Sequence, residues 1–170
     1  MIHHMDEGIG ALLDALRQTG RLDNTLLVFT SDNGGERFSD NWPLVGGKMD
    51  LTEGGIRVPY IVQWPAVVAP GSVSTQHCLT MDWSATLLAA AGVAAHPDYP
   101  LDGASLLPVL RDAGASFPRP MHWRMNHRGQ RAHRSPGVPR CVGQKGAKAA
   151  RHRVFTISAI KATRRDGWTG

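Results

Sequence analysis

The first 18 residues carry a helical pattern of hydrophobic and polar positions. Apolar side chains recur every three or four residues, which places them on one face of an α-helix: Ile2, Met5, Ile9, Leu12, Leu13 and Leu16. Gly20 follows this pattern and can adopt the left-handed conformation that ends a helix. The sequence therefore predicts a helix over residues 2–18.

Two later runs are almost continuously apolar and rich in β-branched residues, as is typical of strands. They cover residues 25–30 (TLLVFT) and 58–64 (VPYIVQW). The first run predicts a strand buried on both faces, as in a parallel sheet covered by helices. Asp82 can cap a further helix that runs to about residue 91, with Leu87 and Leu88 facing inward. A helix, a short turn and a buried strand make half of an α/β unit.

A polar motif, Ser31-Asp32-Asn33-Gly34-Gly35, follows the first predicted strand directly. It lies at the carboxyl end of that strand, where open α/β sheets bind their ligands. Asp32 and Asn33 offer a carboxylate and an amide carbonyl, which are hard oxygen donors suited to Ca²⁺ or Mg²⁺. The alternative is a turn without a ligand, because the same residue types dominate turns for conformational reasons. The long loop that follows predicts a functional segment, since such loops are uncommon in compact domains.

Lys48 is the candidate anion-binding residue of this loop. It follows two glycines and is the only lysine among residues 1–120. Its ammonium group could serve as a point charge for a sulfate or phosphate oxygen. The alternative is a solvated surface lysine. Glu53 and Arg57 could act as a general acid or a substrate clamp, but we favour a salt bridge that shapes the loop.

The charge distribution divides the chain into two unlike segments. Residues 1–120 hold 7 Lys and Arg against 13 Asp and Glu, whereas residues 121–170 hold 12 against 1. From residue 128 to 153 we find neither helical nor strand periodicity, and only residues 154–157 resemble a strand. We therefore expect a domain over residues 1–127 and a basic, disordered tail over 128–170. The tail could bind a polyanion, but it has too few aromatic residues to favour nucleic acid.

Targeting and cross-linking signals are few. No run reaches the roughly 18 apolar residues of a transmembrane helix, and the polar, acidic start is unlike a secretory signal. Cys78 and Cys141 form neither a disulfide framework nor a Cys-x-x-Cys pair. These features predict a chain without a membrane span, and they leave the compartment and the oligomeric state open.

Several short strings carry a family resemblance through their order and spacing. They are Met5-Asp6-Glu7-Gly8-Ile9-Gly10, Asp23-Asn24-Thr25-Leu26, Ser31-Asp32-Asn33-Gly34-Gly35, Gly47-Lys48, Glu53-Gly54-Gly55-Ile56-Arg57-Val58-Pro59, Trp64-Pro65 and Asp102-Gly103. Each string alone is weak. Together they resemble the C-terminal part of the catalytic domain of type I sulfatases (arylsulfatases), over about residues 1–127.

The resemblance implies both a fold and a set of site residues. The fold is α/β and alkaline-phosphatase-like, with a mixed sheet flanked by helices that is incomplete in this chain. The Asp-Asn pair of the family holds a calcium ion, and a lysine contacts the substrate sulfate. At the matching positions these are Asp32 and Asn33 as metal ligands and Lys48 as the catalytic lysine. Mg²⁺ or another divalent cation is the less favoured occupant.

The sulfatase nucleophile has no counterpart in these 170 residues. Family members act through a formylglycine made from the Cys or Ser of a Cys/Ser-x-Pro-x-Arg motif, and neither Cys78 nor Cys141 fits it. We therefore expect a fragment of a sulfuric ester hydrolase that is inactive alone. Its full-length relatives would act on small-molecule or carbohydrate sulfate esters. The alternatives are a phosphate or phosphonate ester hydrolase of the same superfamily and a non-enzymatic module with a polyanion-binding tail.

A change of reading frame would explain the basic tail. The family pattern ends near residues 129–132, and the charge balance and the periodicity change in the same region. We predict that the coding DNA, translated in the two other frames after Arg131, yields an aromatic, acidic and strand-like continuation. Without such a continuation the frameshift hypothesis fails. Salt-sensitive binding to nucleic acid, lost on deletion of residues 132–170, would then favour a functional arm.

Overall fold

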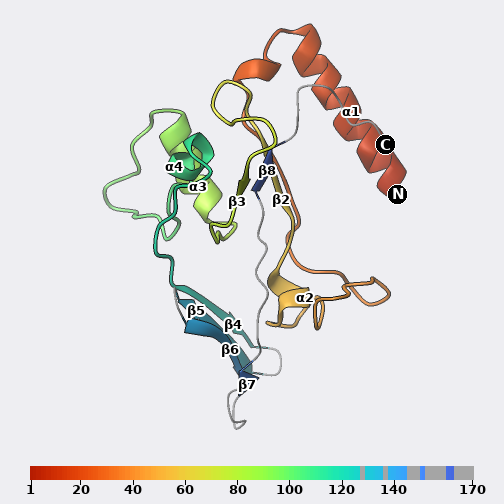
Figure 1. The fold of residues 1–170 in the computed structure, drawn as a ribbon, viewed down its shortest axis with the longest axis vertical. Coiled ribbons are helices and arrows are strands. Elements are labelled where there is room, and N and C mark those ends of the chain that lie inside the picture. The colour runs from red at the N-terminus through yellow and green to blue at the C-terminus, as the bar shows by residue number, and fades with distance from the viewer. Residues whose placement is uncertain (127–128, 136–137, 145–149, 152–159, 163–170) are drawn as a thin grey trace.

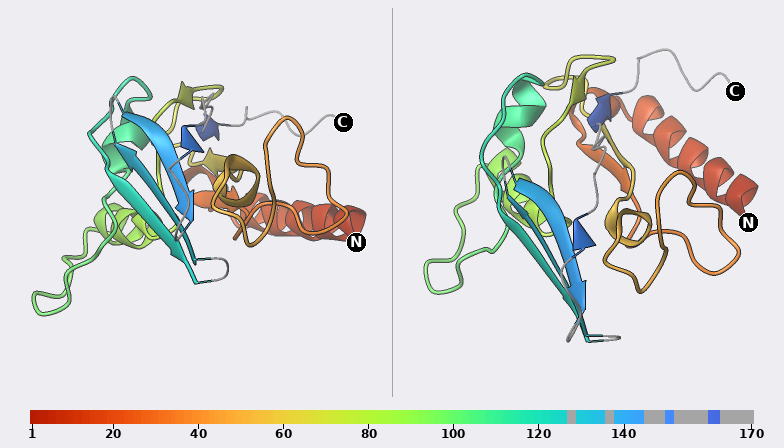
Figure 2. Two further views of the ribbon diagram at one scale, coloured as in Figure 1. Left: turned by 90° about the horizontal axis from the view of Figure 1, so that it is seen from below. Right: turned by 60° about the horizontal axis from the view of Figure 1, so that its bottom comes forward.

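The computed structural model describes residues 1–126, 129–135, 138–144, 150–151 and 160–162. These residues form two four-stranded sheets, in the orders β1-β2-β8-β3 and β4-β5-β6-β7 (Figure 1). In both Figure 1 and Figure 2, helix α1 and the β4–β7 sheet lie at opposite ends of the molecule, with the β1–β2 loop between them. None of the helices in the described part of the chain is long and apolar enough to cross a membrane.

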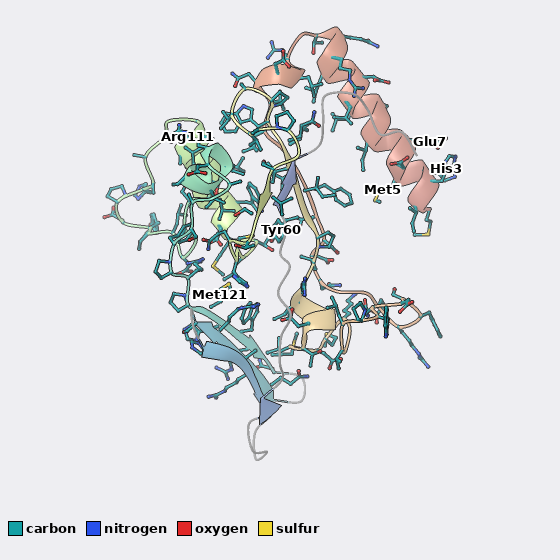
Figure 3. The ribbon with its side chains drawn as sticks, in the orientation of Figure 1. His3, Met5, Glu7, Tyr60, Arg111 and Met121 are labelled. Carbon is teal, nitrogen blue, oxygen red and sulfur yellow. The ribbon has the colours of Figure 1, made fainter. Side chains whose placement is uncertain are left out.

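Helix α1 spans Ile2–Gln18, which confirms the predicted helix. Gly20 has a φ of 66°, so it ends the helix in the left-handed conformation as expected. None of the side chains of α1 is buried, although the helix is amphipathic. Met5 and Leu12 of its apolar face are about half exposed, and Figure 3 shows Met5 on the side of the helix opposite to His3 and Glu7.

Strand β1 (Leu27–Thr30) differs from the prediction in two respects. It pairs antiparallel with β2 (Tyr60–Gln63), so the expected parallel pairing of this strand is wrong. Val28 and Phe29 are 36% and 40% exposed, so β1 is not buried on both faces either. The reason is its position, since β1 is the edge strand of its sheet and α1 does not cover it.

The sheet is mixed, as the resemblance implied. β2 pairs in parallel with β8 (Ile160–Ala162), and β8 pairs antiparallel with β3 (Val73–Ser74). Along β2 the side chains alternate between buried and half-buried positions, with Tyr60 and Val62 on the buried face. This face of β2 is the starting point of the hydrophobic core.

Helices α3 (Asp82–Ala90) and α4 (Leu107–Arg111) complete the core. The ring of Trp83 stacks against Tyr60 with centroids 6.1 Å apart, and Leu106 is fully buried beside them. Leu87 is 52% exposed, so its predicted inward orientation is wrong. The buried Thr86 faces the core instead, because its hydroxyl donates to the Asp82 carbonyl and accepts a hydrogen bond from the Leu106 N–H.

The second sheet contains residues that the sequence pattern did not predict as strands. Its members are β4 (Met121–Met125), β5 (Gln130–Ser135), β6 (Val138–Gln144) and β7 (Ala150–Arg151), all paired antiparallel. The prediction of no strand between residues 128 and 153 is therefore wrong. In β5 the buried Gln130 and Ala132 alternate with the exposed Arg131, a period of two that arginine-rich composition obscured. The predicted strand 154–157 lies outside the described residues, and the reading-frame hypothesis stays a prediction.

Candidate active site

One cavity brings together the three residues predicted from the sequence. Its volume is about 320 Å³, and Asp32, Asn33 and Lys48 all line it. Thr80, from the connector before α3, and Trp123, from β4, contribute to the same lining. Segments that lie far apart in the sequence therefore meet around one cavity.

The Asp-Asn turn begins directly after β1 and is held by local hydrogen bonds. The Ser31 hydroxyl donates to the Asn33 carbonyl over 2.9 Å, and the Asn33 side-chain N–H donates to the Gly34 carbonyl over 2.9 Å. The amide oxygen of Asn33 is thereby left as the side-chain atom that can bind a cation. A Cβ at Gly34 would lie 1.7 Å from the Gly54 carbonyl oxygen, so only glycine fits where the turn meets α2 (Glu53–Ile56).

The donor chemistry of the turn fits calcium, but the number of donors is small. Asp32 supplies a carboxylate and Asn33 an amide oxygen, and Ca²⁺ prefers both types of ligand. Among the described residues no group of three or more His, Cys, Asp or Glu side chains could hold a metal ion. Because Ca²⁺ takes about six to eight oxygen ligands, the turn provides only part of a calcium site.

Asn41 joins the turn to the loop that carries Lys48. Its side-chain oxygen accepts from the Gly35 N–H over 3.1 Å, and its side-chain N–H donates to the Gly46 carbonyl over 3.1 Å. The Lys48 N–H also donates to the Gly35 carbonyl over 2.9 Å. Sequence reasoning missed Asn41, because nothing in its neighbourhood distinguishes it from an ordinary loop asparagine.

Lys48 forms an ion pair with Glu36 at the surface. Its Nζ lies 3.2 Å from the Glu36 Oε2, and both side chains are more than a third exposed. A hydrogen bond from the Arg37 backbone N–H, followed by the Lys48 ammonium, lowers the pKa of Glu36 from its ordinary value. Such an exposed pair is weak in water, so an anion in the cavity can compete with Glu36 for the ammonium group.

Comparison with known proteins identifies the family of this chain. The profile of the Sulfatase family matches residues 1–93, more than half of the sequence. The chain belongs to the sulfatase family. Human N-acetylgalactosamine-6-sulfatase is 38% identical over 128 residues, covering 72% of this chain and 24% of that protein. Mouse steryl-sulfatase is 38% identical over 120 residues, covering 65% of this chain and 19% of that protein.

A solved structure matches this sulfatase chain over most of its length. That structure is a complex with its substrate D-glucosamine-2-N,6-O-disulfate, and it aligns with a TM-score of 0.66 and 26% sequence identity. The alignment covers 88% of this chain and 31% of that chain. It confirms the predicted alkaline-phosphatase-like α/β fold. The sulfatase chain spans about a quarter of the length of its human relative.

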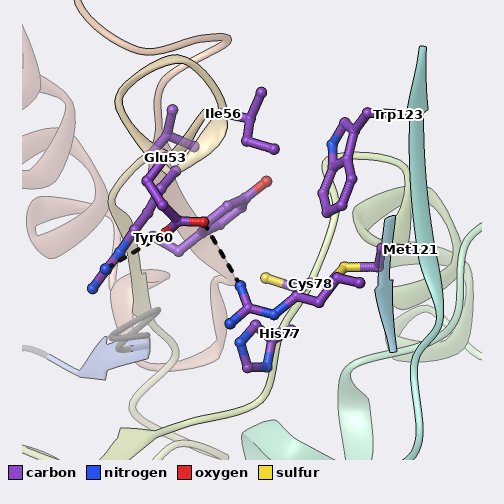
Figure 4. A pocket seen from close by; sticks show the side chains of 10 residues that line it. Glu53, Ile56, Tyr60, His77, Cys78, Met121 and Trp123 are labelled. Atoms are coloured by element: carbon purple, nitrogen blue, oxygen red, sulfur yellow. Dashed lines mark ion pairs between the residues drawn. The ribbon is translucent and has the colours of Figure 1, made fainter. Parts of the chain in front are cut away.

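A smaller chamber beside the cavity contains the ion pairs of α2. Glu53 Oε2 lies 3.6 Å from Arg57 Nη1, and Glu53 Oε1 lies 4.0 Å from Arg134 Nη1 (Figure 4). This confirms the predicted salt bridge between Glu53 and Arg57. The chamber holds only about 40 Å³, so it has little room for a substrate. In this sulfatase chain Glu53 and Arg57 are therefore assigned a structural role in the loop.

His77 and Cys78 line the same chamber, and burial suppresses the charged form of each. Desolvation, followed by the nearby charge of Arg134, lowers the pKa of His77. Desolvation also raises the pKa of the Cys78 thiol to about 12, and the nearby Asp82 adds to this shift. Only a thiolate is a good nucleophile, so Cys78 is inert at neutral pH.

Proposed function

We propose that this chain forms the sulfate-binding part of a sulfuric ester hydrolase site. The supporting observation is that Asp32, Asn33 and Lys48 line one cavity. Two hard oxygen donors suit a divalent cation, and an ammonium group suits an anionic oxygen. A sulfate group can interact with both kinds of charge.

In this proposal Lys48 orients the substrate. Its ammonium group leaves Glu36 and donates hydrogen bonds to a sulfate oxygen, which lowers the repulsion that an approaching nucleophile meets. Asp32 and Asn33 would hold Ca²⁺, and the cation would draw electron density from the sulfate oxygens. Trp123 lines the same cavity. The chain lacks the Cys/Ser-x-Pro-x-Arg motif, so we assign it no nucleophile.

A sulfated sugar is the substrate class that we propose. Among the relatives, N-acetylgalactosamine-6-sulfatase takes its name from an amino sugar, and the matching solved structure holds a sulfated glucosamine. The cavity of this chain suits such a ligand, because the indole of Trp123 lines it together with polar and charged groups. An aromatic ring offers a flat apolar surface to a sugar ring, while the charged groups bind the sulfate.

Binding measurements on the 170-residue chain test this assignment. We expect Asp32→Ala to weaken Ca²⁺ binding about tenfold, because it removes the carboxylate of the Asp-Asn pair. Lys48→Ala should leave Ca²⁺ binding unchanged but weaken the binding of glucosamine 6-sulfate about tenfold in the presence of Ca²⁺. Glu36→Gln should strengthen the binding of glucosamine 6-sulfate about twofold, since Lys48 then has no competing carboxylate at position 36. Isothermal titration calorimetry measures each affinity.

Arg21→Ala is the matched control, because Arg21 is an exposed cation that does not line the cavity. An equal loss of sulfate binding in Arg21→Ala and Lys48→Ala would show a general charge effect and contradict the proposal. So would an unchanged Ca²⁺ affinity in Asp32→Ala. Tighter binding of glucosamine 6-phosphate than of the 6-sulfate would favour a phosphate ester hydrolase.

A further inference from the structure

Gln130, at the start of β5, connects the second sheet to the loop of Lys48. Its side chain is buried, with 3% of the residue exposed. The side-chain oxygen accepts a hydrogen bond from the Leu51 N–H over 2.8 Å. The side-chain N–H donates to the Met49 carbonyl over 3.3 Å. The side-chain amide of Gln130 therefore binds the backbone of Met49 and Leu51, in the segment that directly follows Lys48.

The loop at this point has a conformation that needs such support. Met49 has a φ of 74°, a left-handed value that is costly for a residue with a side chain. Gly46, on the other side of Lys48, has a φ of 82°. The Leu51 side chain is itself buried, so its backbone N–H has poor access to water as an alternative partner. The segment that carries Lys48 thus depends on a partner outside the loop.

We propose that Gln130 is a positioning residue for Lys48. It fixes the backbone of residues 49–51 and thereby sets where the Lys48 ammonium group enters the cavity. This inference rests on the proposed role of Lys48 in sulfate binding. Gln130 does not line the cavity, so it contacts no substrate there and acts through the loop.

The role of Gln130 predicts a split between two affinities. Gln130→Met preserves the shape of the side chain but removes both hydrogen bonds to the loop. We expect it to weaken the binding of glucosamine 6-sulfate about tenfold, because Lys48 loses its fixed position. Ca²⁺ affinity should change by less than about twofold, since Asp32 and Asn33 lie in the turn directly after β1, whereas the Gln130 side chain bonds to Leu51 and Met49. A general loss of structure would lower both affinities.

Hydrogen exchange provides a readout that does not depend on ligand binding. In Gln130→Met the Leu51 amide should exchange at least about tenfold faster, whereas the Lys48 amide, bonded to the Gly35 carbonyl, should change less. Gln130→Glu keeps the acceptor for the Leu51 N–H, so it should restore most of the protection of that amide. Arg131→Ala, at the exposed neighbouring position, is the control.

The outcomes separate this inference from the proposed function. If the unmodified chain binds no sulfated sugar, the proposed function fails. If the Leu51 amide nevertheless exchanges faster in Gln130→Met, Gln130 supports the loop without serving substrate binding, and its positioning role is overturned. If the chain binds the sugar and Gln130→Met binds it equally well, only the positioning role is overturned. A parallel loss of Ca²⁺ and sugar binding would also overturn it, as would unchanged exchange of the Leu51 amide.

Discussion

The purified 170-residue chain is expected to release no measurable product from an aryl sulfate, with or without added Ca²⁺. The chain has no Cys/Ser-x-Pro-x-Arg motif from which a formylglycine could form. Its half-buried Cys78 is no substitute, because burial raises the pKa of this thiol to about 12. When catalytic groups act as a unit, removal of one of them abolishes most of the rate enhancement of the enzyme. A colorimetric assay with p-nitrophenyl sulfate measures this directly.

Addition of the nucleophile-bearing portion of a full-length relative provides the complementary experiment. We expect turnover only when that portion carries its formylglycine and when Lys48 is present in this chain. Lys48→Ala in the reconstituted pair should therefore lower kcat/KM by at least about tenfold. Turnover that stays proportional to the amount of the 170-residue chain through successive purification steps would contradict the prediction. It would require another nucleophile.

The sequence predicted where helices and strands lie better than it predicted which segments pair with them or cover them. Helix α1 was predicted over roughly residues 2–18 and is found there, because its apolar period and the following Gly20 are both local signals. The position of β1 was also clear from its apolar run, but the antiparallel partner and the exposed face were not. An apolar run is compatible with a strand that is buried on both faces. Whether the strand is buried depends on the segments that pack against it.

The site shows the same division between local and distant information. Asp32, Asn33 and Lys48 stand in recognisable motifs, so they could be selected from the sequence. Asn41 and Gln130 hold the site together through hydrogen bonds that span 6 and 79 residues along the chain. A polar side chain in a loop or in a basic strand carries no local sign of such a partner. Only the three-dimensional arrangement reveals it.

The Asp102-Gly103 string has its explanation in the packing of α3. A Cβ at Gly103 would lie 2.1 Å from the Met81 carbonyl oxygen, so the chain passes against the start of the helix too closely for any other residue. This approach lets the Ala104 N–H donate to the Asp82 Oδ1 over 2.8 Å. The Leu79 N–H donates to Oδ2 of the same carboxylate over 2.7 Å. Helix α3 has Met81 as its N-cap residue, so the prediction of Asp82 in that position is wrong. Asp82 instead links the helix to the segments of Leu79 and Ala104.

Substitution of Asp82 by alanine is expected to destabilise the chain by roughly 3–5 kcal/mol. Asp82 is fully buried, and it also forms an ion pair with Arg119, whose side chain is 15% exposed. Its loss leaves a nearly buried guanidinium group without its counterion and two backbone N–H groups without their acceptor. Urea denaturation followed by circular dichroism measures the change. The exposed Asp98→Ala should shift stability by less than about 0.5 kcal/mol, and an equal midpoint for both variants would show that the buried pair contributes little.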